Sequence, residues 1–271
     1  MSLALVQSRA LLGLQAPPVT VEVHLANGLP SFTLVGLADV EVKEARERVR
    51  SALQNAGLEF PHNKRITVNL APADLPKDSG RFDLPIALGI LAASGQIDGT
   101  RLAGYEFAGE LSLSGELRPV RGALATSLAL RTRQITAKLV LPPGSAEEAA
   151  LVPDAQVYRA RHLLDVVRQF LPAPAEGEDH AAPDPGGWAR VTTVPLQGCT
   201  AYADLADVKG QAGAKRALEI AAAGSHSLLL MGPPGSGKSM LAQRFAGVLP
   251  PMGVDEALES AAIASLAGRF A

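Results

Sequence analysis

The stretch that most constrains this chain is residues 232–239, Gly-Pro-Pro-Gly-Ser-Gly-Lys-Ser, which has the spacing Gly-x-x-x-x-Gly-Lys-Ser. An apolar run at 228–231 precedes it, and Met240, Leu241 and Phe245 follow it at helical spacing. This order predicts a buried strand, then a phosphate-binding loop, then a helix. The alternative is a Gly-Pro turn that binds nothing, but the pattern arises by chance in such a chain with a probability on the order of one per cent.

The residue types in this loop fit the chemistry of a nucleoside triphosphate. Its glycines can adopt positive φ, so successive backbone N–H groups can point inward at an anion, and the following helix adds its unpaired N–H donors. The lysine can reach the β- and γ-phosphates, and the last serine can ligate Mg²⁺. The predicted ligands are therefore ATP and Mg²⁺, with Ser239 as the metal ligand. The predicted nucleotide-binding residues are Gly232, Pro233, Pro234, Gly235, Ser236, Gly237, Lys238 and Ser239.

Size and composition exclude several classes of protein. The 271 residues allow one large or two ordinary domains, and 47% hydrophobic residues can build a real core. The net charge of −2 gives no overall signature of nucleic-acid binding. A single cysteine, Cys199, excludes an intramolecular disulfide framework. The N-terminus does not resemble a signal peptide and no apolar run approaches about 18 residues, so we expect a soluble, cytoplasmic protein without a membrane contact.

The first part of the chain, residues 1–171, alternates strand-like and helix-like segments, which predicts an α/β domain. We expect strands where apolar and polar residues alternate and helices where apolar residues recur every three or four positions. The predicted strands are 19–25, 30–35, 65–70, 138–141 and 157–159, with a hairpin of 107–113 and 117–120; the predicted helices are 39–56, 84–93, 123–130 and 163–170.

The predicted helix 39–56 has a densely charged outer face. An ordinary solvated face with mixed charges explains it, and the alternative is contact with nucleic acid or with a neighbouring subunit. The charged residues are Lys43, Glu44, Arg46, Glu47, Arg48 and Arg50.

Residues 172–200 are rich in proline, glycine and acidic residues and are predicted to be a linker.

Residues 201–271 are predicted to form the start of a second domain around the phosphate-binding loop. Hydrolysis in such a domain also needs a second strand that ends in an acidic pair, the Walker B element, and later sensor residues. None of these follows Ser239, so we expect a C-terminally truncated chain, and whether it hydrolyses ATP or only binds it stays open.

Three blocks of the sequence together resemble the bacterial ComM/YifB family of Mg-chelatase-like AAA+ ATPases. They are residues 35–39, Val-Gly-Leu-Ala-Asp; residues 69–77, Asn-Leu-Ala-Pro-Ala-Asp-Leu-Pro-Lys, leading into Asp-Leu-Pro-Ile-Ala at 83–87; and residues 207–211 followed by the phosphate-binding loop. The resemblance implies an adenine-side role for Asp207, Val208, Gly210 and Gln211, for which the alternative is a simple helix N-cap.

The resemblance also implies a first domain similar to the Lon protease domain, a fold related to domain 2 of ribosomal protein S5. Arg81 occupies the position of the Lon nucleophilic serine, and Thr126 that of the catalytic lysine. Arginine cannot attack a carbonyl and threonine cannot serve as a desolvated lysine base, so this domain is expected to be catalytically dead. A rescue by Ser79 beside Lys77 is the alternative; turn and helix-cap hydrogen bonds from Asp78, Ser79 and Asp83 explain these residues more simply.

The function that this resemblance implies is an AAA+ motor, a homo-oligomeric, hexameric ring that binds DNA and drives branch migration during natural transformation and recombination. DNA as a partner rests on the resemblance alone. Two other classes stay open: an ATPase subunit of a Mg-chelatase, which needs a partner that supplies a porphyrin site, and an ATP-dependent Lon-like protease.

Overall fold

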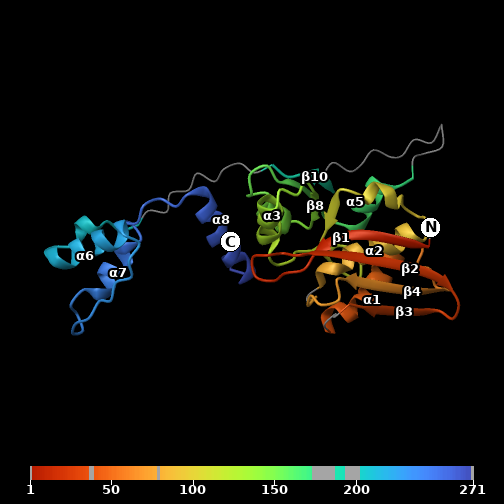
Figure 1. The fold of residues 1–271 in the computed structure, drawn as a ribbon, viewed down its shortest axis with the longest axis horizontal. Coiled ribbons are helices and arrows are strands. Elements are labelled where there is room, and N and C mark those ends of the chain that lie inside the picture. The colour runs from red at the N-terminus through yellow and green to blue at the C-terminus, as the bar shows by residue number, and fades with distance from the viewer. Residues whose placement is uncertain (1, 37–39, 78–79, 173–186, 193–201, 270–271) are drawn as a thin grey trace. The chain divides into compact units, whose positions relative to one another are not determined.

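The computed structural model describes residues 2–36, 40–77, 80–172, 187–192 and 202–269, and its internal contacts divide the chain into two units (Figure 1). The first unit is Met1–Val194 together with Leu258–Ala271, and the second is Pro195–Ala257. Within the described ranges, every helix is too short or too polar to cross a membrane.

The first unit is built on an eight-stranded mixed sheet with the strand order β10-β9-β8-β5-β1-β2-β4-β3. Strands β1, β2 and β4 pair antiparallel, whereas β5 pairs parallel with both β1 and β8. The α/β class predicted from the sequence is therefore confirmed. The strands are β1 Leu3–Arg9, β2 Pro18–Asn27, β3 Ser31–Val35, β4 Lys64–Ala71, β5 Tyr105–Phe107, β8 Lys138–Leu141, β9 Gln156–Ala160 and β10 Trp188–Arg190, with a separate hairpin of β6 Glu110–Leu111 and β7 Leu117–Arg118.

One face of the sheet is covered by α1 (Val40–Asn55) and α2 (Asp83–Ala93), as Figure 1 shows. All eleven residues of α2 are buried, because the helix lies between the sheet and α1. Gly89 makes this close approach possible, since a Cβ at that position would lie 2.4 Å from Val23 Cγ2 in β2. The alternating pattern of β2, with Val21 and Leu25 among its buried residues, supplies the opposite wall of this core.

The other face of β8 and β9 is covered by α3 (Ala123–Thr132) and α4 (Ser145–Ala149), which form a second apolar cluster. Helix α5 (Leu163–Val167) instead joins the main core beside α1 and α2. Leu258 and Ala262 of α8 (Val254–Leu266) pack against α3, so the end of the chain belongs to this unit.

Sequence periodicity predicts most of these elements but misses four. The helices at α1, α2 and α3 and the strands at β2, β4 and β8 lie at the predicted positions. The sequence does not predict β1, α4, β10 or α8, and β10 lies inside the segment predicted to be a linker. Trp188 at its start pairs with Ala160 of β9, so residues 188–190 belong to the sheet. A three-residue strand is too short to show a periodic pattern.

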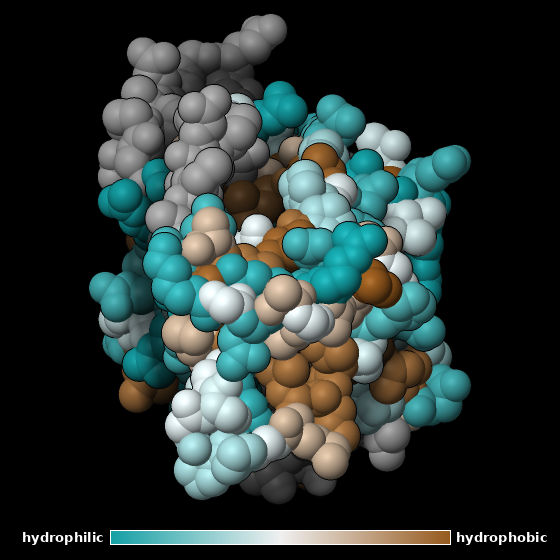
Figure 2. Space-filling model, turned by 90° about the vertical axis from the view of Figure 1, so that its left-hand side faces the viewer, coloured by the Kyte–Doolittle hydropathy of each residue, from teal (hydrophilic) through white to brown (hydrophobic). Residues whose placement is uncertain are grey.

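The second unit contains α6 (Ala212–Ala223) and α7 (Lys238–Phe245) around a small core of Val208, Leu218 and Leu241. The strand predicted at 228–231 is wrong: the backbone there belongs to no strand. A strand needs a neighbouring strand to pair with, and none forms among the described residues of this unit. Leu229 and Met231 are consequently 79% and 82% exposed. Figure 2 shows that hydrophobic residues reach the surface on the face in view.

Candidate functional site

The predicted phosphate-binding loop is a tight turn that leads directly into a helix. Gly232, Gly235 and Gly237 have φ angles of 157°, 81° and 83°, values that glycine adopts without strain. Gly237 caps the N-terminus of α7, so the first helical residue is Lys238. The turn and the unpaired N–H groups of the first helical turn are the two features that a phosphate site requires.

The Lys238 side chain folds back over this loop. Its ammonium group donates to the carbonyl oxygens of Gly232 at 2.7 Å and Pro233 at 2.8 Å, and lies 3.3 Å from Ser236 Oγ. Ser236 Oγ in turn donates to Pro233 O at 2.9 Å. These bonds hold a cation at the mouth of the loop, where it can exchange carbonyl oxygens for phosphate oxygens. Ser239, the predicted Mg²⁺ ligand, lies in the first turn of α7 and is exposed.

The segment predicted to lie on the adenine side reaches the loop. Gln211 Nε2 donates to the Ser236 carbonyl at 3.3 Å, and Val208 is buried against Leu241 of α7. The alternative role of a helix N-cap also fits this segment, because Gln211 is the N-cap residue of α6, although its side chain makes no capping hydrogen bond. Asp204, outside the segment, caps the 3₁₀ helix Leu205–Asp207. The Asp207 carboxylate lies 3.8 Å from Arg244 Nη2 instead.

Arg81 and Thr126, which the family resemblance aligns with the Lon dyad, both bond to the backbone of residues 121–122 in the first unit. Arg81 is 1% exposed, and its Nη2 donates to the carbonyl of Arg121 at 3.5 Å, immediately before α3. Thr126 Oγ1 donates to the carbonyl of Gly122 at 3.1 Å, one helical turn back. Both side chains therefore bond to backbone carbonyl groups and take part in packing.

Lys77 is also buried, and its ammonium group donates to the carbonyl of Pro72. Burial lowers the pKa of Lys77, whereas the nearby Asp74 carboxylate opposes this effect. The suggested partner for residual proteolysis, Ser79, and its neighbour Asp78 lie outside the described residues, as does Asp39, the N-cap suggested for α1.

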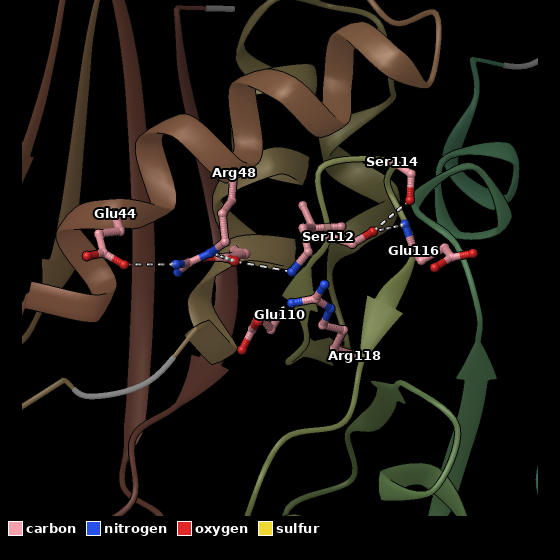
Figure 3. Close-up of polar contacts among 9 residues, drawn as sticks. Glu44, Arg48, Glu110, Ser112, Ser114, Glu116 and Arg118 are labelled. Atoms are coloured by element: carbon pink, nitrogen blue, oxygen red, sulfur yellow. Dashed lines mark hydrogen bonds and ion pairs between the residues drawn. The ribbon is translucent and has the colours of Figure 1, made fainter.

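Sequence reasoning missed a buried ion pair close to these positions (Figure 3). Arg48 on α1 binds Asp83 at the start of α2 through two bonds, Nε to Oδ2 at 2.6 Å and Nη2 to Oδ1 at 3.1 Å. The same carboxylate accepts from the backbone N–H of Leu111 at 3.1 Å. Burial raises the pKa of Asp83 to about 6, and Arg48 limits this rise. The sequence pattern places Arg48 on a solvated helix face, because its partner Asp83 lies 35 residues away and local patterns do not extend that far.

Comparison with known proteins gives two family models and a set of curated relatives. The model "Subunit ChlI of Mg-chelatase" matches residues 21–145, and the model "Magnesium chelatase, subunit ChlI" matches residues 204–271. The competence protein ComM of Haemophilus influenzae is 53% identical over 266 residues, and the uncharacterized protein YifB of Escherichia coli is 50% identical over 267. The chain belongs to the ComM/YifB family of Mg-chelatase-like proteins.

An uncharacterized protein of Mycobacterium bovis shows how far this similarity extends, with 41% identity over 268 residues. Each of these alignments covers 98% or 99% of this chain and 50% of the relative. The chain thus spans about half the length of the curated relatives it matches, and both units take part in the similarity.

Proposed function

We propose that residues 232–239 bind ATP together with Mg²⁺. The observation that carries this proposal is the loop itself, with three positive-φ glycines that lead into α7 and the Lys238 ammonium group held at its mouth. The backbone N–H groups and Lys238 would hold the phosphates, and Ser239 would ligate the metal. The bound metal would neutralise phosphate charge, and Gln211 and Val208 would contact the base side.

We further propose that the full-length protein is an AAA+ motor, a ring of identical subunits that works on DNA during transformation and recombination, where it drives branch migration. Support comes from the relative named competence protein ComM, which is similar along both units. The first unit would be a Lon-like platform without protease activity, because Arg81 and Thr126 offer neither a nucleophile nor a base. A protease would need both.

The second candidate is an ATPase subunit of a Mg-chelatase. Both matching family models carry the name of that enzyme's ChlI subunit, which is the observation in its favour. This candidate requires a partner protein that brings a porphyrin, whereas the motor requires only DNA and further copies of the chain.

A measurement of ATP hydrolysis by the full-length protein separates these candidates. We expect the rate to rise on addition of a synthetic four-way DNA junction at low salt, and to fall back as added salt weakens the phosphate contacts. In the same experiment the protein should move the branch point of the junction. An ATP hydrolysis rate that responds to a porphyrin and chelatase partner subunits but not to DNA would favour the second candidate. ATP-dependent cleavage of casein would instead support the Lon-like protease alternative.

A further inference from the structure

Five of the eleven aromatic residues of the chain gather at one end of the first unit's sheet. The Tyr158 and Trp188 rings stack with centroids 5.2 Å apart and an interplanar angle of 27°, and Tyr105 meets Phe170 edge-on at 5.2 Å. Phe107 completes the cluster. Tyr105, Tyr158 and Trp188 are only half-buried. We call the surface formed by Tyr105, Tyr158 and Trp188, together with the nearby cations Lys138, Arg168 and Arg190, the aromatic face.

Strand register places cations beside these rings. Lys138 is the ladder partner of Tyr105, and its ammonium group lies 4.9 Å from the centre of that ring. Arg190 is the ladder partner of Tyr158 in the β9–β10 pair. Residues directly opposite one another in a ladder point to the same side of the sheet, so each cation shares a face with its ring.

Two further arginines lie on the elements that border the cluster. Arg168 is exposed in the 3₁₀ turn that carries Phe170, and Arg101 donates to the carbonyl of Leu171 at 2.7 Å. Within the described ranges, none of Lys138, Arg168 and Arg190 forms an ion pair with a carboxylate.

The acidic groups beside this face already have partners. Glu106 binds Arg9 at 2.6 Å on the opposite face of β5 from Tyr105, and Asp98 accepts two hydrogen bonds from Thr100. Asp165, which lies beside Gly187, accepts from the backbone N–H groups of Arg161 and His162. The described part of the face therefore carries more cations than carboxylates, although the whole chain has a net charge of −2. Packing among the rings explains the aromatic cluster, but it does not explain a border of cations without carboxylate partners.

We propose that the aromatic face binds a single strand of nucleic acid, with bases against the rings and phosphates on the cations. The proposal deepens the proposed function, on which it rests, by naming a DNA contact on the first unit. Single strands offer free base faces that stack on aromatic side chains, whereas the bases of a duplex are already stacked. Charge complementarity supports the same occupant, because phosphates favour cations that lack carboxylate partners.

The test uses Trp188, the only tryptophan of this chain, as its reporter. The 271-residue chain is titrated at low salt with an oligothymidylate of about twenty nucleotides, longer than the usual site size. We expect saturable quenching of Trp188 fluorescence that follows the anisotropy of the labelled oligonucleotide. A duplex of equal length should bind more weakly and quench less.

Matched variants locate the binding surface. Lys138→Gln with Arg190→Gln should weaken binding about tenfold or more, and should lower the slope of log affinity against log salt by about 0.7 for each lost phosphate contact. Arg46→Gln with Arg50→Gln removes the same charge from α1 and should leave binding unchanged. Thermal unfolding of each variant checks that the fold is kept, which matters most for Lys138→Gln because Lys138 contacts the Tyr105 ring.

Several results would overturn the inference: binding without Trp188 quenching, equal quenching by duplex, or greater loss in the α1 variant than in the Lys138/Arg190 variant. ATP affinity is measured on the same preparations and reports on residues 232–239 separately. Intact ATP binding together with DNA binding outside the aromatic face would contradict this inference but not the proposed function. If neither this chain nor the full-length protein bound DNA, both the inference and the DNA-motor proposal would be wrong.

Discussion

Replacement of Lys238 by alanine should lower the affinity for ATP·Mg²⁺ at least about 100-fold. A charged hydrogen bond contributes about 1.5–3 kcal/mol, and the ammonium group, which now bonds to Gly232 O and Pro233 O, can make more than one such bond to phosphates. A loss of about 3 kcal/mol of binding free energy corresponds to an affinity about 100-fold lower. Isothermal titration calorimetry measures the change directly.

The matched control for this variant is Arg216→Ala. Arg216 lies on α6 in the same unit, its side chain is 72% exposed, and its ion pair with Glu219 is at the surface, so its loss should leave ATP affinity within about twofold. Lys238→Met retains most of the side-chain volume and tests whether the loop keeps its shape. An unchanged affinity in folded Lys238→Ala and Lys238→Met proteins would show that the phosphates bind elsewhere.

Replacement of Arg48 by methionine should cost about 3–5 kcal/mol of folding stability at pH 7.5, the largest loss we expect from a single change in the first unit. The variant leaves the Asp83 carboxylate, whose side chain is 1% exposed, without the guanidinium that binds it through two hydrogen bonds. Urea unfolding measures the change. Arg46→Met is the control, since Arg46 is half exposed on the same helix and should cost little.

The cost of Arg48→Met should depend on pH in a defined direction. Burial places the pKa of folded Asp83 at about 6, above its ordinary value of 3.8, so the folded state holds this proton more tightly than the unfolded state. That contribution to stability is complete below the unfolded pKa and is lost as the pH rises through about 6. Without Arg48 the folded pKa rises further, so the variant should recover stability at pH 5. An equal cost at both pH values would assign the loss to packing instead.

The phosphate-binding loop could be predicted because its chemistry is local. Eight consecutive residues determine the turn, the donor groups and the cation, and Gly235 and Gly237 adopt the backbone that their type permits. The helices of the first unit could be predicted for a similar reason, since burial of one helical face imposes a period that Val49 and Leu53 of α1 display.

Features that depend on distant partners could not be predicted. Arg48 has the same local surroundings as the exposed Arg46, and only the position of Asp83 in the fold separates their environments. Strand β10 exists because β9 offers it an edge. Residues 228–231 show the opposite case to β10. This apolar run suits a strand, but no neighbouring strand exists within the described part of its unit, so the run lies exposed.

If residues 232–239 hold a nucleotide by its phosphates, calorimetric titration of the unmodified chain with ATP, ADP, AMP and adenosine in the presence of Mg²⁺ should show it most directly. ATP and ADP should bind, AMP should bind far more weakly, and adenosine should give no measurable heat, because the loop offers N–H groups and the Lys238 cation to phosphate oxygens. Equal binding of ATP and adenosine would contradict this expectation.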